Sequence, residues 1–157
     1  IELLIIFSIL LVSCLGFLFF NWPKASIFMG DSGSIFLGYI FSALIIYSYI
    51  LDKLSFYTWV VVFGYYLSDT VITSLIRLAT VKKWYGTHRS HAYQNLARVI
   101  KSHSKVTIGV IMFHIFWLLP LSLCTVLYPH YGIQACALAL LPPVLWTIKF
   151  GPLYSNE

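Results

Sequence analysis

The chain has 157 residues, of which 60% are hydrophobic and only 10% are charged. A soluble globular domain carries about 25% charged residues, so the composition excludes that class. The mean hydropathy is +0.87, and several apolar runs approach the ~20 residues that a membrane-spanning helix needs. The net charge of +5 does not indicate nucleic-acid binding, because the basic residues cluster beside the apolar runs. We therefore expect an all-α, polytopic membrane helical bundle with no nucleic-acid partner.

The apolar runs predict about five transmembrane helices. In chain order they cover residues 3–20, 34–51, 56–78, 106–127 and 133–148, approximately. Pro120 and the Pro142-Pro143 pair are expected to kink or break the last two, because proline lacks a backbone N–H. We expect residues 1–157 to form a single membrane domain. Since the chain starts at Ile1 without a leading Met and the first span begins almost at once, we also expect the C-terminal part of a longer protein.

The basic residues predict the orientation of these spans. All but one fall on one side of a five-span arrangement: Lys24, Arg77, Lys82, Lys83, Arg89, Arg98, Lys101, Lys105 and Lys149. Only Lys53 falls on the other side. The Lys/Arg-rich side of a membrane protein is cytoplasmic. The loops at about 21–33 and 79–105 are therefore predicted to share the cytoplasmic face.

The first of these loops leads into the motif Gly30-Asp31-Ser32-Gly33-Ser34, at the start of an apolar run. A carboxylate at a membrane edge needs compensation, and a Mg²⁺ ion shared with substrate phosphates would supply it. Asp31 also suits a helix N-cap, and both interpretations are open. Asn21 offers a further oxygen ligand or a hydrogen bond on the same face, with an interfacial cap as its alternative.

The second loop contains the run Thr87-His88-Arg89-Ser90-His91-Ala92-Tyr93-Gln94-Asn95. His88 and His91 are three residues apart and share a face if the segment is helical. Arg89 can bind phosphate oxygens through two parallel hydrogen bonds. These polar side chains suit a sugar-diphosphate ligand, whereas zinc is disfavoured because no cysteine is near. A solvated positive-inside loop is the alternative, although it explains the histidines poorly.

Asp69 is an ionisable residue inside the third predicted span. Thr73 and Arg77 follow at i+4 and i+8, on the same face of a helix. We favour a local polar network that docks the basic loop over a catalytic role for Asp69.

Together, Asn21 and the run from Phe28 through Gly30-Asp31-Ser32-Gly33-Ser34 to Leu37-Gly38 resemble the polyprenyl-phosphate N-acetylhexosamine-1-phosphate transferases, which are of the glycosyltransferase family 4 type. The phospho-N-acetylmuramoyl-pentapeptide transferase belongs to the same superfamily. The run from His88 to Gln94 is most similar to the branch that initiates O-antigen or other surface polysaccharides. Many relatives carry a His-His pair where this chain has Tyr93-Gln94.

The resemblance implies transfer of N-acetylhexosamine-1-phosphate from a UDP-N-acetylhexosamine to undecaprenyl phosphate, with UMP as the leaving group. Asp31 would be the catalytic, Mg²⁺-associated aspartate, with Mn²⁺ as an alternative metal. Asn21, His88, Arg89 and His91 would bind substrate. The implied location is the bacterial inner membrane with a cytoplasmic active face. The resemblance leaves open which sugar is transferred, and whether the protein forms a homodimer.

The family also carries an Asp-Asp motif in earlier cytoplasmic loops, and this chain, with five acidic residues, has no adjacent pair. We therefore expect this part of the enzyme to be inactive alone. A catalytically incomplete membrane remnant that only binds lipid or nucleotide is the main alternative. A small transporter subunit that uses Asp69 as a proton site is a weaker one.

Overall fold

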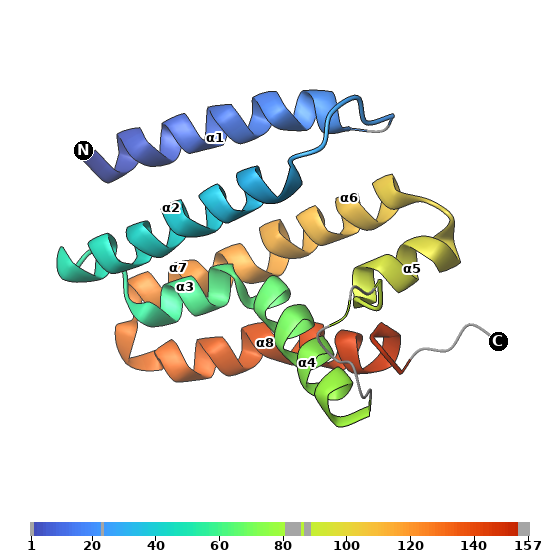
Figure 1. Cartoon of the computed structure of the whole chain (residues 1–157). Coiled ribbons are helices and arrows are strands. Elements are labelled where there is room, and N and C mark those ends of the chain that lie inside the picture. Colours follow the sequence, from blue (N-terminus) through green and yellow to red (C-terminus); the bar gives the residue numbers. More distant parts are fainter. Residues whose placement is uncertain (1, 23, 81–85, 87–88, 154–157) are drawn as a thin grey trace. The chain divides into compact units, whose positions relative to one another are not determined.

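The computed structural model describes residues 2–22, 24–80, 86 and 89–153. Regular structure in these residues is entirely helical (Figure 1), which confirms the predicted all-α class. The chain divides into two compact units, Ile1–Leu54 and Ser55–Glu157, and each is described by itself.

The first unit consists of helices α1 (Glu2–Asn21) and α2 (Gly30–Ile50). Both are long and apolar enough to cross a membrane. The Tyr47 hydroxyl, near the end of α2, donates a 2.7 Å hydrogen bond to a carboxylate oxygen of Glu2 at the start of α1. Since this bond joins the first turn of one helix to the last turn of the other, the two helices run antiparallel (Figure 1).

The second unit contains the remaining elements. They are α3 (Phe56–Val62), α4 (Gly64–Thr80), α5 (Ala92–Ile100), α6 (His103–Phe113), the π-helical turn η1 (His114–Leu118), α7 (Leu119–Leu127), the 3-10 turn η2 (Pro129–Tyr131) and α8 (Gly132–Phe150). Residues 103–127 form one continuous helical segment, and residues 129–150 form another; both pass the length and hydropathy criteria for a span. Among the described residues, four helical segments are by themselves long and apolar enough to cross a membrane. If the bent pair of α3 and α4 is one span, it makes a fifth. The five predicted spans therefore have helical counterparts.

The third predicted span is sharply bent. Helices α3 and α4 meet at an angle of 75° instead of forming one straight segment. The bend lies at Phe63, before the polar residues of α4. A Cβ on Gly64 would approach the Leu140 side chain to 3.2 Å, so the bend brings the backbone close to α8. Close approach of this kind favours glycine at position 64.

The prolines do not interrupt the last two helical segments. The π turn η1 ends at Leu118, two residues before Pro120, and π turns are local irregularities within an otherwise continuous helix. Helix α8 runs through both Pro142 and Pro143. The predicted break in the last span is therefore not observed, because neighbouring groups in a membrane bundle can satisfy the carbonyls that proline leaves.

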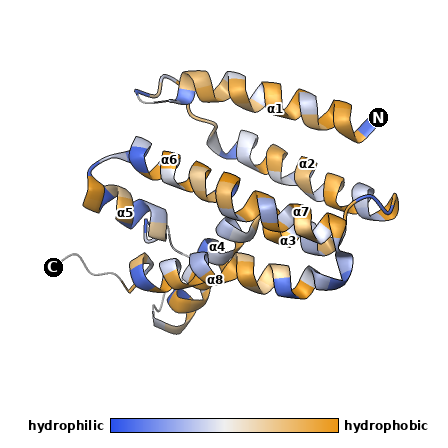
Figure 2. Cartoon of the chain, turned by 180° about the vertical axis from the view of Figure 1, so that it is seen from behind, coloured by the Kyte–Doolittle hydropathy of each residue, from blue (hydrophilic) through white to orange (hydrophobic). Residues whose placement is uncertain are grey.

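The core of the second unit is small. Val61, Tyr65, Leu118 and Ala139 form a buried cluster that joins α3, α4, η1 and α8. Many large apolar side chains are exposed, and hydrophobic residues occur along most of the helices (Figure 2). Helices that face hydrocarbon on the outside show this distribution, since lipid replaces water as their solvent.

Candidate functional site

The loop that precedes α2 is closed on the end of α1 by side-chain hydrogen bonds. The amide Nδ2 of Asn21 donates to the Ile27 carbonyl at 2.8 Å. The Ser26 hydroxyl donates to the Phe20 carbonyl at 3.0 Å. The last carbonyls of a helix lack intrahelical partners, so the bond from Ser26 caps the end of α1. The bond from Asn21 holds the loop against this helix end. Asn21 thus shapes the loop with its nitrogen, and its oxygen is the atom available to a ligand.

Asp31 lies in the first turn of α2, which begins at Gly30, four residues earlier than predicted. Gly30 has a φ of 64°, a left-handed conformation that favours glycine. The Ser34 hydroxyl donates to the Asp31 backbone carbonyl at 3.0 Å, while the Asp31 side chain itself is exposed. The positive end of the helix dipole favours a carboxylate at this position.

Asp31 can serve as one ligand of a divalent cation. No group of three His, Cys, Asp or Glu side chains among the described residues could hold a metal by itself. Mg²⁺ is commonly bound by one or two carboxylates together with substrate phosphates and water. An exposed carboxylate at a helix start fits that incomplete donor set, with the substrate supplying further oxygens.

The second loop is anchored to α4 through Asp69, whose side chain is 7% exposed. Its Oδ1 accepts hydrogen bonds from the Ala92 backbone N–H at 3.0 Å and from the Thr73 hydroxyl at 3.4 Å. Its Oδ2 lies 3.4 Å from Nδ1 of His91. The predicted network that docks the basic loop on Asp69 is therefore present.

The start of α5 is satisfied within the protein. The His91 backbone N–H donates to the Gln94 side-chain oxygen at 3.3 Å, and the next N–H, of Ala92, goes to Asp69. Helix N-termini attract phosphate because their N–H groups lack partners. In α5 the Ala92 N–H is taken by Asp69, and the Gln94 N–H is taken by His91.

A second anchor lies one turn further along α5. Asn95 is buried and donates from Nδ2 to the carbonyls of Phe150 and Gly151, at 2.8 and 3.0 Å. Arg98 donates to the Asn95 side-chain oxygen at 2.8 Å and to the Arg89 carbonyl at 2.6 Å. Asn95, which suited a ligand in the sequence, therefore caps the end of α8 instead.

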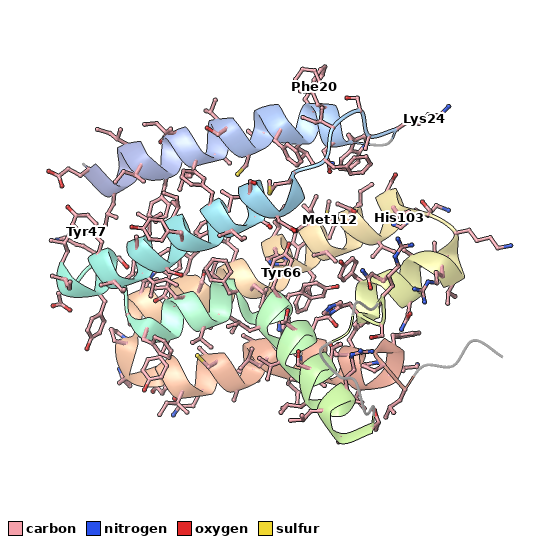
Figure 3. All side chains as sticks on the ribbon, viewed as in Figure 1. Phe20, Lys24, Tyr47, Tyr66, His103 and Met112 are labelled. Atoms are coloured by element: carbon pink, nitrogen blue, oxygen red, sulfur yellow. The ribbon has the colours of Figure 1, made fainter. Side chains whose placement is uncertain are left out.

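The residues of the second loop that were predicted to bind substrate differ in their exposure to solvent. The Arg89 side chain is exposed, and the His91 side chain is 23% exposed and stacks on Tyr93 with a 6.0 Å centroid separation. His88 lies outside the described residues. Figure 3 shows side-chain nitrogens gathered around α5, close to the labelled His103. The Ser90 hydroxyl, which belongs to the predicted polar run, is buried and has no hydrogen-bond partner among the described residues.

Parts of the chain are similar to known proteins. Residues 1–49, which include the Asp31 motif, match the sequence model of glycosyl transferase family 4. A probable undecaprenyl-phosphate N-acetylglucosaminyl 1-phosphate transferase from Bacillus subtilis is 34% identical over 98 residues, 60% of this chain and 27% of the relative. The phospho-N-acetylmuramoyl-pentapeptide-transferase of Bifidobacterium animalis subsp. lactis is 64% identical over 33 residues, 21% of this chain and 9% of the relative. That of Streptomyces coelicolor is 49% identical over 47 residues, 30% of this chain and 13% of the relative.

The chain thus spans about a quarter or less of the length of these relatives. No solved structure matches it. The matches confirm the resemblance that was read from the motif around Asp31.

Proposed function

We propose that the intact protein, through its sequence relationship to glycosyl transferase family 4, transfers a sugar-1-phosphate from a UDP-N-acetylhexosamine to undecaprenyl phosphate. UMP leaves, and a diphosphate bond forms between the sugar and the lipid. The curated relatives are named as transferases that act on undecaprenyl phosphate or on phospho-N-acetylmuramoyl-pentapeptide, which supports this reaction class.

The observation that carries the proposal is the position of Asp31. It presents an exposed carboxylate in the first turn of a helix long and apolar enough to span a membrane, within the residues that match the family. A carboxylate placed at the end of a span, with its loop held by hydrogen bonds, is suited to meet a polar substrate whose lipid partner stays in the bilayer.

In this mechanism Asp31 would hold Mg²⁺, or Mn²⁺, which when bound supplies charge neutralisation to the diphosphate. Arg89 would bind phosphate oxygens bidentately, and His91 would donate a hydrogen bond to a phosphate or to the sugar. His88 and Asn21 are proposed as further substrate contacts. Phosphoryl transfer depends mainly on positioning and charge stabilisation, so a set of fixed donors is the contribution expected of these residues.

The proposed setting follows from the same residues. The Lys/Arg-rich loops favour a cytoplasmic active face in a bacterial inner membrane. The product would start a lipid-linked surface polysaccharide, such as O-antigen, lipopolysaccharide or a cell-wall polymer. A homodimer is compatible with this arrangement and is tested by the mass of the purified protein in detergent.

The decisive experiment measures UMP release by membranes that contain the full-length gene product, with UDP-N-acetylglucosamine, undecaprenyl phosphate and Mg²⁺. We expect Asp31→Asn to abolish UMP release while membrane insertion stays normal. Asp52→Asn is the matched control, because Asp52 has a φ of 53°, which Asn tolerates, and lies at the other end of α2.

Normal turnover in Asp31→Asn would contradict the metal role of Asp31. Binding of UDP-sugar or lipid without any UMP release, in the wild-type protein, would favour the incomplete remnant over the enzyme. A panel with UDP-N-acetylgalactosamine in place of UDP-N-acetylglucosamine identifies the donor sugar.

A further inference from the structure

We propose that a groove in the second unit binds one anionic phospholipid of the surrounding membrane, with an acyl chain in the groove and the lipid phosphate at Lys105. The groove has a volume of about 410 Å³, which is within the range of about 300–1,000 Å³ that is typical of small-molecule sites. Helices α5, α6 and α8 supply most of its walls, and Tyr65 of α4 also lines it. Such a lipid would be a structural ligand, separate from the substrates of the proposed reaction.

The lining of the groove changes from charged to apolar along the spans. Lys105 lies in the first turn of α6, and Phe113 lies eight residues further along the same helix, a rise of about 12 Å. On α8, Trp146 lies near the end of the span, whereas Pro142 and Pro143 lie about one turn further from that end. A phospholipid has the same order of chemistry, with a charged headgroup at the membrane edge and hydrocarbon inside.

The floor of the groove belongs to the packed core of the unit. Tyr65 is a member of the buried core cluster, and Val110 and Phe113 pack against that cluster. Ile100 is 41% exposed and Gly109 is exposed, so the groove also reaches the protein surface. A hydrocarbon chain is the ligand that suits a preformed apolar groove on a helix bundle whose solvent is lipid.

The charge of the groove favours an anionic headgroup. Lys105 is the only charged side chain among the described residues that line it, and no described carboxylate forms an ion pair with Lys105. The sequence contains no Asp or Glu from residue 70 to residue 156. A lysine can lay its aliphatic stem along apolar surface and hold its ammonium group at the membrane edge. Basic pockets between membrane helices bind anionic lipid headgroups in this way.

The groove is separate from the residues that are proposed to meet the substrates. Asp31, Arg89 and His91 are not among its lining residues. An acceptor lipid must bring its phosphate to the sugar diphosphate, whereas a lipid phosphate at Lys105 would remain with the groove. This arrangement therefore favours a resident phospholipid over the reacting lipid.

A bound acyl chain would steady helix α5. Leu96 and Ile100 of α5 line the groove together with residues of α6 and α8. The same helix begins next to His91 and is tied to the end of α8 by Asn95. Because the chain would add contacts between these three helices, we expect slower amide hydrogen exchange in α5 when the lipid is bound.

The first test fills the groove. Gly109 lines it, and a Cβ added at Gly109 meets no atom within 4 Å, so the side chain of Gly109→Leu has room to enter. Gly16→Leu is the matched control, because a Cβ at Gly16 of α1 also meets no atom within 4 Å and Gly16 does not line the groove.

Native mass spectrometry of the full-length protein in detergent, with added dioleoyl-phosphatidylglycerol, counts the bound lipid. We expect the wild type and Gly16→Leu to retain one phosphatidylglycerol that Gly109→Leu loses. Equal retention by Gly109→Leu, or no retained lipid in the wild type, overturns the proposal. The second result would mean that another part of the full-length protein fills the groove.

The second test removes the charge. Lys105→Gln should weaken phosphatidylglycerol binding about fivefold, the effect of one basic residue beside an anionic lipid surface, and should reduce the preference over phosphatidylcholine. Lys149→Gln removes the same charge from α8 outside the groove lining and should leave the affinity unchanged. Equal weakening in both variants would indicate only diffuse surface charge and overturns the proposal. Lys105 is exposed, so this comparison remains available if Gly109→Leu fails to fold.

The third test identifies the lipid and its effect on α5. In nanodiscs of phosphatidylcholine, added phosphatidylglycerol should slow hydrogen exchange of α5 in the wild type and have no such effect in Gly109→Leu. If Gly109→Leu loses undecaprenyl phosphate and retains phosphatidylglycerol, the groove belongs to the acceptor lipid and the proposal is overturned. These measurements require no turnover, so a protein without UMP release can still show the lipid site, and an active protein can lack it.

Discussion

The indole N–H of Trp117 donates a hydrogen bond to the backbone carbonyl of Leu138 at 3.3 Å. In a regular helix that carbonyl would accept from residue 142, which is a proline without an N–H. Trp117 lies in the π turn η1, so this irregular helical segment supplies the hydrogen-bond donor that α8 lacks at Pro142. An unpaired carbonyl is costly in hydrocarbon, and this contact replaces the donor that α8 lacks at Pro142.

Replacing the donor tests this account. Trp117→Phe should destabilise the protein by about 0.5–1.5 kcal/mol, since the Leu138 carbonyl loses its partner. The matched control is Trp146→Phe, because the Trp146 indole N–H is buried and has no hydrogen-bond partner in the part of the chain that the structure describes. Its removal should be neutral or stabilising. Reversible unfolding of the purified protein in detergent measures both, and equal losses in the two variants would contradict the assignment.

Two glycines of the second unit should respond in opposite directions to alanine. Gly132 is buried at the start of α8, where an added Cβ would overlap the Tyr57 ring. Gly132→Ala should therefore cost about 1–3 kcal/mol through overpacking. A Cβ on Gly109 of α6 meets no atom within 4 Å, so Gly109→Ala should be neutral or stabilise by up to about 1 kcal/mol. Thermal unfolding midpoints in detergent compare the two, and a stable Gly132→Ala would show that Tyr57 moves aside without loss.

Adjacent amides on α5 should differ in their tolerance of a carboxylate. Asn95 uses its NH₂ group to cap two carbonyls at the end of α8, so Asn95→Asp replaces both donors with a negative charge. We expect a loss of about 1–3 kcal/mol and faster amide hydrogen exchange in the last turn of α8.

Gln94→Glu is the control for that substitution. The Gln94 side-chain oxygen accepts the His91 backbone N–H, and Glu retains this acceptor at a helix start. Glu loses the bond from Gln94 Nε2 to the Tyr93 hydroxyl, which is 3.3 Å long and exposed to solvent. Its stability should stay within about 0.5 kcal/mol of wild type. Equal sensitivity of the two positions would mean that the Asn95 amide does not hold α8.

The candidate site shows how far residue chemistry alone can lead. Asp31 and His91 could be selected from their residue types and their places beside apolar runs. The role of Asn95 could not, because its partners at Phe150 and Gly151 are more than 50 residues away along the chain. The Asp69 network was anticipated from helical spacing to Thr73, whereas its contact with the Ala92 N–H depends on how the loop folds back onto α4.

Composition and hydropathy by themselves determined the all-α membrane class and the approximate positions of five apolar segments, because a bilayer requires about 20 apolar residues per span and hydrogen-bonded backbone throughout. The tertiary structure alone decided where those segments depart from straight helices. At the 75° bend at Phe63, Gly64 packs closely against Leu140. In α8, the Trp117 indole N–H gives the Leu138 carbonyl the donor that Pro142 lacks. The local sequence shows where proline removes a backbone hydrogen-bond donor, but a replacement donor must come from a residue that packs against the helix.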